Sequence, residues 1–368
     1  MNFPLKPGPH VRVNRTNASI IGVVVRAALF VAVWAVVNRF LVFGAGAAIH
    51  VTLMVLTAVT GGTFAHFIFD FGMAKLERRT FDAAPFIKRF KNGETIITGL
   101  ILAIAMQPGA HLYVVFINVM FAEIFGKLIY GGYGQNIFNP VAVGLIFNAL
   151  TFGGTSLAPG WLATTDVTTG STPLAALNAA GWQMTPSEAY YYLSDLGGLG
   201  HMLLGMVRGS VGETSRLALL LALAYMIYKR AADWVTPVFY FGSVFLMTSI
   251  YGLIIGAGML YPVIHLLTGG IMLGGVFLAS DPVTIPITRQ GKAIFAILLA
   301  FLTLMIRLNS GHAEGVAFSI LLMNIVVAII DRKTQGITSA NINKKHASLA
   351  ITFVASTAVL ILFTIFVP

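Results

Sequence analysis

The stretch GGYGQNIFNPVAVG, residues 131–144, has a counterpart further along the chain in GGVFLASDPVTIPITRQG, residues 274–291. Each contains a glycine pair, an aromatic residue and an Asx-Pro-Val step, Asn139-Pro140-Val141 in the first and Asp281-Pro282-Val283 in the second. Because proline removes a helix hydrogen bond and glycine loosens the backbone, each step is expected to break a helix at membrane depth. Broken helices in matching positions of two halves often border a ligand or ion site. The pair predicts an internal repeat with a buried site, and two ordinary turns between helices are the alternative.

The composition around these stretches is that of an integral membrane protein. The 368 residues are 57% hydrophobic and 10% charged, with a mean hydropathy of +0.85, whereas a soluble domain carries about 25% charged residues. The opening segment MNFPLKPGPHVRVNRTNAS lacks the small-residue cleavage pattern of a signal peptide. The first apolar segment is therefore expected to remain as a helix.

Apolar runs predict eleven membrane-spanning segments, since about 20 apolar residues cross a bilayer as a helix and shorter ones cross when tilted or broken. They lie at 20–42, 49–71, 94–107, 112–130, 137–153, 214–229, 236–256, 258–279, 292–306, 313–330 and 347–367. The expected fold is an all-α polytopic membrane protein with ten or eleven transmembrane helices, in two five-helix repeats with broken helices plus an extra C-terminal helix. The last segment also suits a helix lying against the bundle.

Lysine and arginine predict the orientation, because positively charged loops stay in the cytoplasm. With the N-terminus inside, nearly every basic cluster falls on the inner side, whereas residues 154–213 contain one basic residue, Arg208, and four acidic ones. The predicted organisation is a cytoplasmic N-terminus at 1–19, a first half at 20–153, an external loop at 154–213, a second half at 214–330, and a basic loop with the extra helix at 331–368.

Several classes of function are excluded or disfavoured by the residues present. The net charge of +10 is a topology signal in a membrane chain, so no nucleic-acid partner is expected. The chain contains no cysteine, so it cannot hold a disulfide or a Cys-ligated iron–sulfur cluster. It also lacks a Walker loop, a dinucleotide-binding glycine motif and a paired His–carboxylate metal spacing. We therefore expect no metal site, and any redox chemistry needs another carrier and partner subunits.

Four stretches carry a family resemblance. They are FAEIFGKLIYGGYGQNIFNPVAVG, RGSVGETS, FLASDPVTIPITRQGK and MIRLNSGHAEGVAFSILLMN, and their order and spacing resemble the signature stretches of the NqrB/RnfD family of membrane redox subunits. The short N-terminus, PGPHVRVNRTNAS, resembles the RnfD branch. The C-terminal segment departs from the family's ten-helix pattern, which affects the expected C-terminal topology and not the core.

The resemblance implies a covalent flavin on the external loop. In this family a threonine at the end of a Ser-Gly-Ala-Thr-like motif carries FMN through a phosphoester, and the matching positions here are Thr169, Gly170, Ser171 and Thr172, followed by Pro173. Thr172 is the expected attachment residue. Gly170 and its small neighbours give access to a flavin transferase, and Asp166 is the nearby acidic group. Without the family, the same run reads as a turn with Thr172 capping a helix that starts at Pro173.

The stretch RGSVGETS, residues 208–215, has two compatible interpretations. The spacing of Ser210 and Glu213 predicts a capping box before the following apolar segment. By resemblance, the same loop packs against the flavin near the outer surface, through Gly212 and Glu213.

Polar residues inside the apolar segments are the remaining candidates, since intramembrane ionisable groups are costly. Glu123 and Lys127 are four apart, which predicts an ion pair on one helical face. The candidate buried flavin or ion site comprises Glu123, Asn136, Asn139, Asp281 and Thr284, with Asn118 and Asn148 as further polar residues. The last group, His66, His265 and Asp70, lies near segment ends, where solvation at the interface is the preferred interpretation.

The resemblance implies the D subunit of an Rnf-type complex, which couples electron flow between ferredoxin and NAD to Na⁺ or H⁺ movement across the bacterial or archaeal cytoplasmic membrane. Its expected cofactors are covalent FMN and, as in the family's B subunit, non-covalent riboflavin near the two Pro-containing stretches. The expected partners are the other Rnf subunits, above all the flavin-bearing G subunit and the membrane subunits, and a flavin transferase for maturation. Two alternatives are a quinone-reducing Nqr-type B subunit and a urea-type channel without redox chemistry.

Overall fold

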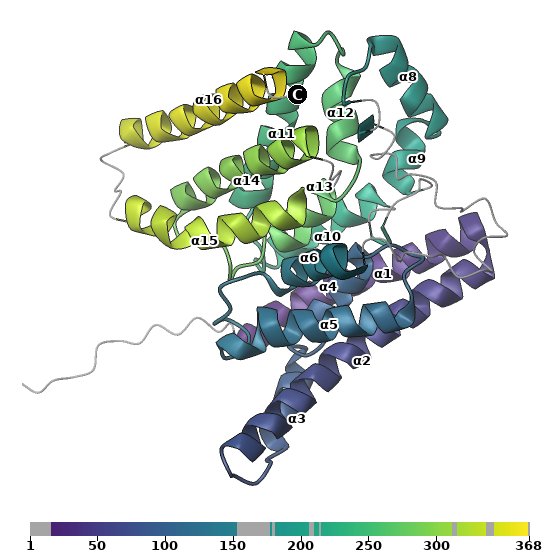
Figure 1. Ribbon diagram of the computed structural model, residues 1–368, viewed down its shortest axis with the longest axis vertical. Coiled ribbons are helices and arrows are strands. Elements are labelled where there is room, and N and C mark those ends of the chain that lie inside the picture. The colour runs from purple at the N-terminus through teal and green to yellow at the C-terminus, as the bar shows by residue number, and fades with distance from the viewer. Residues whose placement is uncertain are drawn as a thin grey trace, which may run out of the picture.

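The protein is all-helical over the part of the chain that the structure describes. This computed structural model describes residues 16–152, 177–178, 181–205, 210–212, 215–310, 315–335 and 342–366, and these residues contain helices and no strand (Figure 1). Six of the described helices are long and apolar enough to cross a membrane, or seven if one bent pair is a single span. The predicted class, an all-α polytopic membrane protein, is confirmed.

A helix lies at each of the eleven segments predicted from the sequence. The first five positions hold α1 (Asn17–Phe43), α2 (Ala45–Leu76), α4 (Ile97–Ala105), α5 (Leu112–Gly126) with the short η1 (Leu128–Tyr130), and α6 (Pro140–Phe152). The other six hold α10 (Arg216–Tyr228), α11 (Val235–Ile254), α12 (Leu260–Leu267) with α13 (Ile271–Leu273) and η2 (Gly274–Leu278), α14 (Arg289–Asn309), α15 (Val316–Thr334) and α16 (Ile342–Phe366). Among the described residues between them lie the short helices α3 (Ala84–Asn92), α8 (Pro186–Asp195) and α9 (Gly198–Leu204).

Several of these helices are shorter than full membrane spans. Helix α4 has nine residues and α6 and α10 have 13 each. Because a helix rises about 1.5 Å per residue, nine residues reach about 14 Å of a hydrocarbon core about 30 Å thick. The sequence therefore predicted the positions of the helices correctly, and these three helices lie at predicted segments that were also short, 94–107, 137–153 and 214–229.

The Pro-containing steps do not interrupt helices. Pro140 is the first residue of α6, where its missing N–H costs no helix hydrogen bond, and Asp281-Pro282 lies in the non-helical stretch between η2 and α14. The observed break lies inside the predicted segment 258–279, where α12 and the following helix are bent by 66° and Gly269 has a φ of 68°. The expectation of helices broken at the proline steps was wrong in position.

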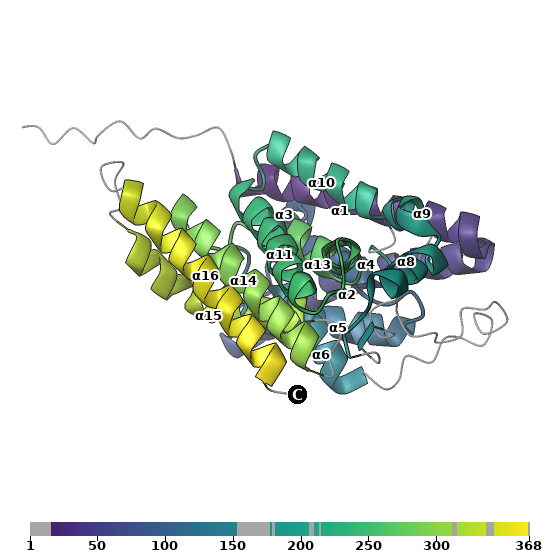
Figure 2. The same cartoon turned by 90° about the horizontal axis from the view of Figure 1, so that it is seen from above.

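The helices pair in the same order in both parts of the chain. Helix α2 packs against α5 and α5 against α6, and correspondingly α11 packs against α14 and α14 against α15. Between the parts, α1 packs against α10 and α6 against α15 (Figures 1 and 2). This is the contact pattern expected of two related halves. The boundaries 20–153 and 214–330 stay a prediction.

The C-terminal helix α16 lies along α14, as Figure 2 shows. Two side-chain hydrogen bonds join them, from Gln290 Nε2 to Ser348 Oγ at 2.7 Å and from Asn309 Nδ2 to Thr364 Oγ1 at 3.2 Å. The apolar segment His346–Ile365 is long enough to cross a membrane. Helix α16 is therefore an addition to the second part of the bundle.

Helix N-termini differ in one place from the sequence prediction. The cap of α10 is Ser215, whose Oγ accepts from the backbone N–H of Ala218 at 3.1 Å, so Ser210 does not cap this helix. A complete capping box occurs instead at α8, where Thr185 and Glu188 bond to each other's backbone N–H groups. The side-chain hydroxyl closest to the first turn caps α10, and the earlier Ser210 lies too far from that turn.

Candidate functional site

The two Asx-Pro-Val steps meet in the interior of the bundle. Asn139 Nδ2 donates to Asp281 Oδ2 at 3.3 Å and to the carbonyl oxygen of Leu278 at 3.4 Å. The Asn139 side chain is held for this contact because its Oδ1 caps α6, accepting from the N–H groups of Val141 at 3.0 Å and Ala142 at 3.3 Å. The start of α6 therefore orients one amide toward the second step.

The second step is held by its own hydrogen bonds. Asp281 Oδ1 accepts from the Val283 N–H at 3.2 Å, and Oδ2 accepts from the Thr284 hydroxyl at 3.2 Å. Asn324 of α15 joins the two steps, because its Oδ1 accepts from the Asn139 N–H at 2.9 Å and its Nδ2 donates to the Thr284 carbonyl at 3.1 Å. Sequence reasoning did not select Asn324, although it ends one of the signature stretches.

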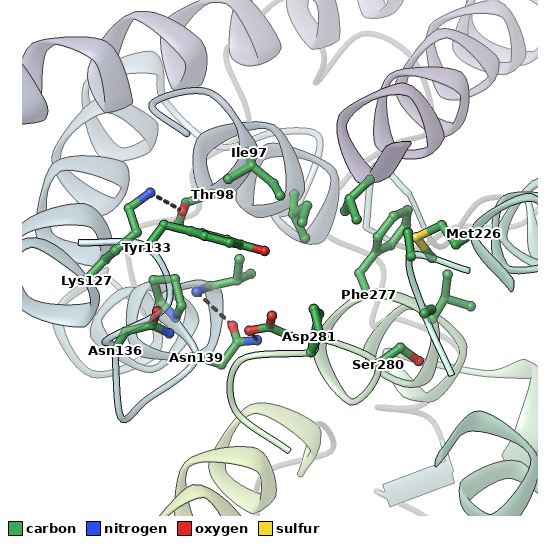
Figure 3. A pocket seen from close by; sticks show the side chains of 18 residues that line it. Ile97, Thr98, Lys127, Tyr133, Asn136, Asn139, Met226, Phe277, Ser280 and Asp281 are labelled. Carbon is green, nitrogen blue, oxygen red and sulfur yellow. Dashed lines mark hydrogen bonds between the residues drawn. The ribbon is translucent and has the colours of Figure 1, made fainter. Parts of the chain in front are cut away.

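A cavity lies beside this network (Figure 3). Its polar lining residues are Thr98, Lys127, Tyr133, Asn136, Asn139, Ser280 and Asp281, and its apolar lining includes Ile97, Met226, Val276 and Phe277. The cavity volume is about 40 Å³, which is room for a few water molecules. Residues of α4, of the loop before α6 and of the η2 segment therefore surround one polar space.

Asn136 lines this cavity. Its Nδ2 donates to the Phe138 carbonyl at 2.9 Å and its Oδ1 accepts from the Gly134 N–H at 3.3 Å. The Asn136 side chain is 6% exposed. The loop between η1 and α6 thus presents Asn136 and Tyr133 to the same space.

Glu123 lies outside the cavity lining and belongs to an adjacent buried cluster. Its Oε2 lies 2.5 Å from Lys127 Nζ, which confirms the predicted ion pair, and 3.3 Å from His66 Nε2. Lys127 touches both places, since it also lines the cavity. The predicted buried set is therefore divided: Glu123 belongs to this cluster, and Thr284 bonds to Asp281 without lining the cavity. The other three line the cavity and, with the two aromatic residues there, form what we call the cavity group: Asn136, Asn139, Asp281, Tyr133 and Phe277.

The histidines predicted at the membrane interface are instead in the interior. His66 and His265 are each 1% exposed, so interface solvation does not explain them. The His265 carbonyl accepts from Arg307 Nη1 at 2.8 Å. Asp70 is partly exposed and pairs with Arg89 of α3, which agrees with a position near the end of α2.

The external-loop residues have two different outcomes. Thr172 and its predicted neighbours Asp166, Thr169, Gly170, Ser171 and Pro173 lie outside the described residues, as does Glu213. Gly212 is described, and its N–H donates to the Ile104 carbonyl at 2.5 Å. A Cβ at Gly212 would lie 3.0 Å from that same oxygen and 3.0 Å from Leu273 Cδ1. Glycine therefore allows this loop to approach the end of α4 closely.

The cavity group has a defined chemical character. Two aromatic rings, Tyr133 and Phe277, offer flat apolar faces, whereas Asn136 and Asn139 are amides and Asp281 is a carboxyl group. Such a lining suits a planar molecule with hydrogen-bonding edges. Among the described residues, no three His, Asp or Glu side chains are grouped as they would be around a metal ion. Because part of the chain lies outside the described residues, the expected absence of a metal site stays a prediction.

Comparisons with known proteins show the family of the chain. The family model described as "NQR2, RnfD, RnfE family" matches residues 5–338. The chain is 34% identical over 343 residues to the D subunit of the proton-translocating ferredoxin:NAD(+) oxidoreductase complex of Clostridium ljungdahlii, covering 90% of this chain and 95% of that protein. It is 30% identical over 335 residues to the D subunit of the Na(+)-translocating ferredoxin:NAD(+) oxidoreductase complex of Acetobacterium woodii, covering 91% of this chain and 94% of that protein. The chain belongs to the NQR2, RnfD, RnfE family.

Proposed function

We propose that this chain is the D subunit of an Rnf-type complex and carries electrons within the membrane. The similarity over nine-tenths of the chain to proteins named as the D subunits of such complexes is the observation that carries the proposal. The complex would couple electron flow between ferredoxin and NAD to the movement of Na⁺ or H⁺. This chain would supply placement and electrostatics, while a bound flavin carries the electron.

The covalent FMN is proposed to be attached to Thr172. A phosphoester needs a hydroxyl side chain on a segment that a transferase can reach, and Thr169-Gly170-Ser171-Thr172 offers one with small neighbours. Asp166, Pro173, Gly212 and Glu213 would support this loop. The chain contains no nucleotide-binding motif that could activate FAD, so maturation would require a separate flavin transferase with Mg²⁺.

Replacing Thr172 tests the proposal directly. In Thr172→Ala the hydroxyl is lost, so the purified chain should lose one FMN-sized mass and its in-gel fluorescence, while it still inserts in the membrane. The neighbouring hydroxyls Thr168 and Ser171 are matched controls, and their alanine variants should keep the mass. A Thr172→Ala chain that retains the flavin mass would contradict the assignment, as would a native chain that lacks it when co-expressed with the transferase.

The cavity group is proposed to hold a second, non-covalent flavin, riboflavin. The donor set supports this, since Asn136 and Asn139 can address the polar edge of an isoalloxazine ring and Tyr133 and Phe277 can pack on its faces. The present volume of about 40 Å³ holds waters, so these side chains would move apart when the ring binds. Bound there, riboflavin would supply one-electron chemistry between the loop and the bundle interior.

The proposed location is the bacterial or archaeal cytoplasmic membrane, with residues 154–213 on the external side. The proposed partners are the other Rnf subunits, with the flavin-bearing G subunit and the membrane subunits as electron donor and acceptor. The names of the relatives favour this assembly over a quinone-reducing Nqr complex. A channel without redox chemistry would leave the purified chain colourless, so its absorption spectrum separates that alternative.

A further inference from the structure

A buried cluster of charged groups lies beside the cavity and has no role in the proposal above. We call His66, Glu123 and Lys127 the inner cluster. Their side chains are between 0% and 1% exposed, and one carboxylate oxygen of Glu123, Oε2, lies 2.5 Å from Lys127 Nζ and 3.3 Å from His66 Nε2. Three titratable side chains, from α2, from α5 and from the residue that follows α5, are thus in contact in the buried interior.

The inner cluster contains hydrogen-bonding capacity that the described residues do not use. Both carboxylate oxygens of Glu123, both ring nitrogens of His66 and the neighbouring Thr95 Oγ1 are buried, and none of them has a hydrogen bond of ordinary geometry among the described residues. The contacts of Glu123 Oε2 with Lys127 and His66 are therefore close charge contacts. Leaving buried polar atoms unpaired is costly, so such positions usually bind water or exchange a proton. A further cost comes from burying the ion pair itself, which is often no more stable than an apolar replacement. Stability alone therefore does not account for the cluster.

Lys127 connects the inner cluster to the cavity. Its Nζ donates to Thr98 Oγ1 at 3.2 Å and to the Glu94 carbonyl at 2.7 Å, and both Lys127 and Thr98 line the cavity (Figure 3). Only the Lys127 side chain therefore separates a charge in the cavity from the Glu123 carboxylate. In a low-dielectric interior, charges at this separation interact strongly.

We propose that the inner cluster is a proton-binding site that compensates for negative charge arriving in the cavity. The inference rests on the proposed function, because the charge is the electron that reaches the cavity flavin from a one-electron donor of the complex. When one electron reaches the cavity flavin, neutral His66 takes one proton from water: one O–H bond breaks, one N–H bond forms, and the hydroxide leaves to bulk solvent, while Glu123 stays ionised beside it. The electron and the proton together leave the buried region with an unchanged net charge.

The groups around His66 are consistent with this role. Glu123 of α5 contacts His66, and Lys127, the residue that follows α5, contacts Glu123 and donates to the Glu94 carbonyl. In the same segment before α4, the Thr95 carbonyl lies beside Gly62 of α2, and Glu94 is partly exposed. On α2 itself the next charged residue, Asp70, is engaged by Arg89 of α3, and Arg26 of α1 donates to Tyr225 of α10. Glu123 is therefore the one described acidic side chain in contact with His66.

The test uses the purified chain with its bound flavin, reconstituted in lipid nanodiscs. The midpoint potential of the non-covalent flavin is measured at a series of pH values, because its slope gives the protons taken up per electron. We expect about one proton per electron in the native chain and a decrease of at least about half in His66→Gln and Glu123→Gln. Asp70→Asn is the matched control on the same helix and should keep the native slope.

A second measurement separates a protonation role from a structural one. Reduced-minus-oxidised infrared spectra of the native chain, labelled with ¹⁵N-histidine, should contain an imidazole band that disappears in His66→Gln. The proposal would be overturned if the midpoint potential depended on pH in both variants as it does in the native chain, or if the native chain had no histidine band. This second arm needs no variant to fold.

Failure of the proposed function is recognised independently. If denaturation of the native chain releases no non-covalent flavin, the proposed occupant of the cavity is wrong. The proton site is then read by an infrared pH titration of the chain without flavin. A buried histidine that titrates in the native chain and not in His66→Gln supports the site, and a native chain without such a titration contradicts it.

Discussion

At the scale of single residues, Asn139 contacts three different segments through its side chain and its backbone N–H. Its Oδ1 caps α6, its Nδ2 reaches Asp281, and its N–H donates to Asn324. The Asn139 side chain is 3% exposed. An apolar side chain of similar size would keep the volume but leave the first turn of α6 and one carboxylate oxygen with fewer partners.

We expect Asn139→Leu and Asp281→Leu each to impair electron transfer or ion transport by the assembled complex. Covalent flavin should stay in place, because neither residue belongs to the attachment loop. The measurements are in-gel flavin fluorescence and electron transfer with ion uptake in vesicles. The control is Asn309→Leu on α14, which removes the contact with Thr364 of α16 and a bond to the Met305 carbonyl of its own helix, and neither lies at the two steps. Full turnover and full ion transport in both site variants would show that the two steps serve only as turns.

At the scale of helices, glycine permits α4 to cross α2 very closely. A Cβ at Gly99 of α4 would lie 2.4 Å from the backbone oxygen of Ala58, and one at Gly62 of α2 would lie 2.5 Å from the Thr95 carbonyl. Backbone atoms cannot rotate away as a flexible side chain does. This crossing brings Thr95 and Thr98 beside the inner cluster, so it also shapes the wall of the cavity.

Gly99→Ala should destabilise the protein by about 1–3 kcal/mol, the usual cost of overpacking a close contact. Its melting temperature in detergent or nanodiscs, followed by the circular dichroism of the helices, measures the effect. Gly72→Ala on α2, the other helix of this crossing, is the control, because a Cβ at Gly72 would have no atom within 4 Å. Equal melting temperatures for the two variants would mean that the helices do not approach as described.

At the scale of the whole molecule, the outer surface of the bundle is apolar. Large hydrophobic side chains are exposed along α1, α2 and α16, with Leu41 72%, Leu56 55% and Ile351 67% exposed. Polar and charged side chains gather instead in the interior and in the basic loops. This inside-out distribution is expected of a bundle surrounded by lipid.

Single-cysteine labelling tests the proposed orientation, since the native chain contains no cysteine. Ser187 at the start of α8 is exposed, and Ser187→Cys should react with an impermeant thiol reagent added to intact cells or spheroplasts. The paired control is Lys88→Cys on α3, which is also exposed and should react only in inside-out vesicles. The reverse labelling pattern would invert the proposed topology.

The local spacing of residues determined much of this protein. Hydropathy alone placed a helix at each of eleven segments, and the spacing of Glu123 and Lys127 predicted their ion pair, because residues four apart on a helix share one face. The matching Pro-containing stretches also indicated two places that border one site. These features depend on residues that are close together along the chain, so they can be recognised in the sequence without knowledge of the fold.

Only the tertiary structure decided which distant groups touch. Asn139 and Asp281 are 142 positions apart, and they meet because α6 and the η2 segment converge beside α15. Packing also placed His66 against Glu123, carried Lys127 into the cavity wall and bent the chain at Gly269 instead of at a proline. Such contacts depend on how closely whole helices approach, so no local pattern of residues contains them.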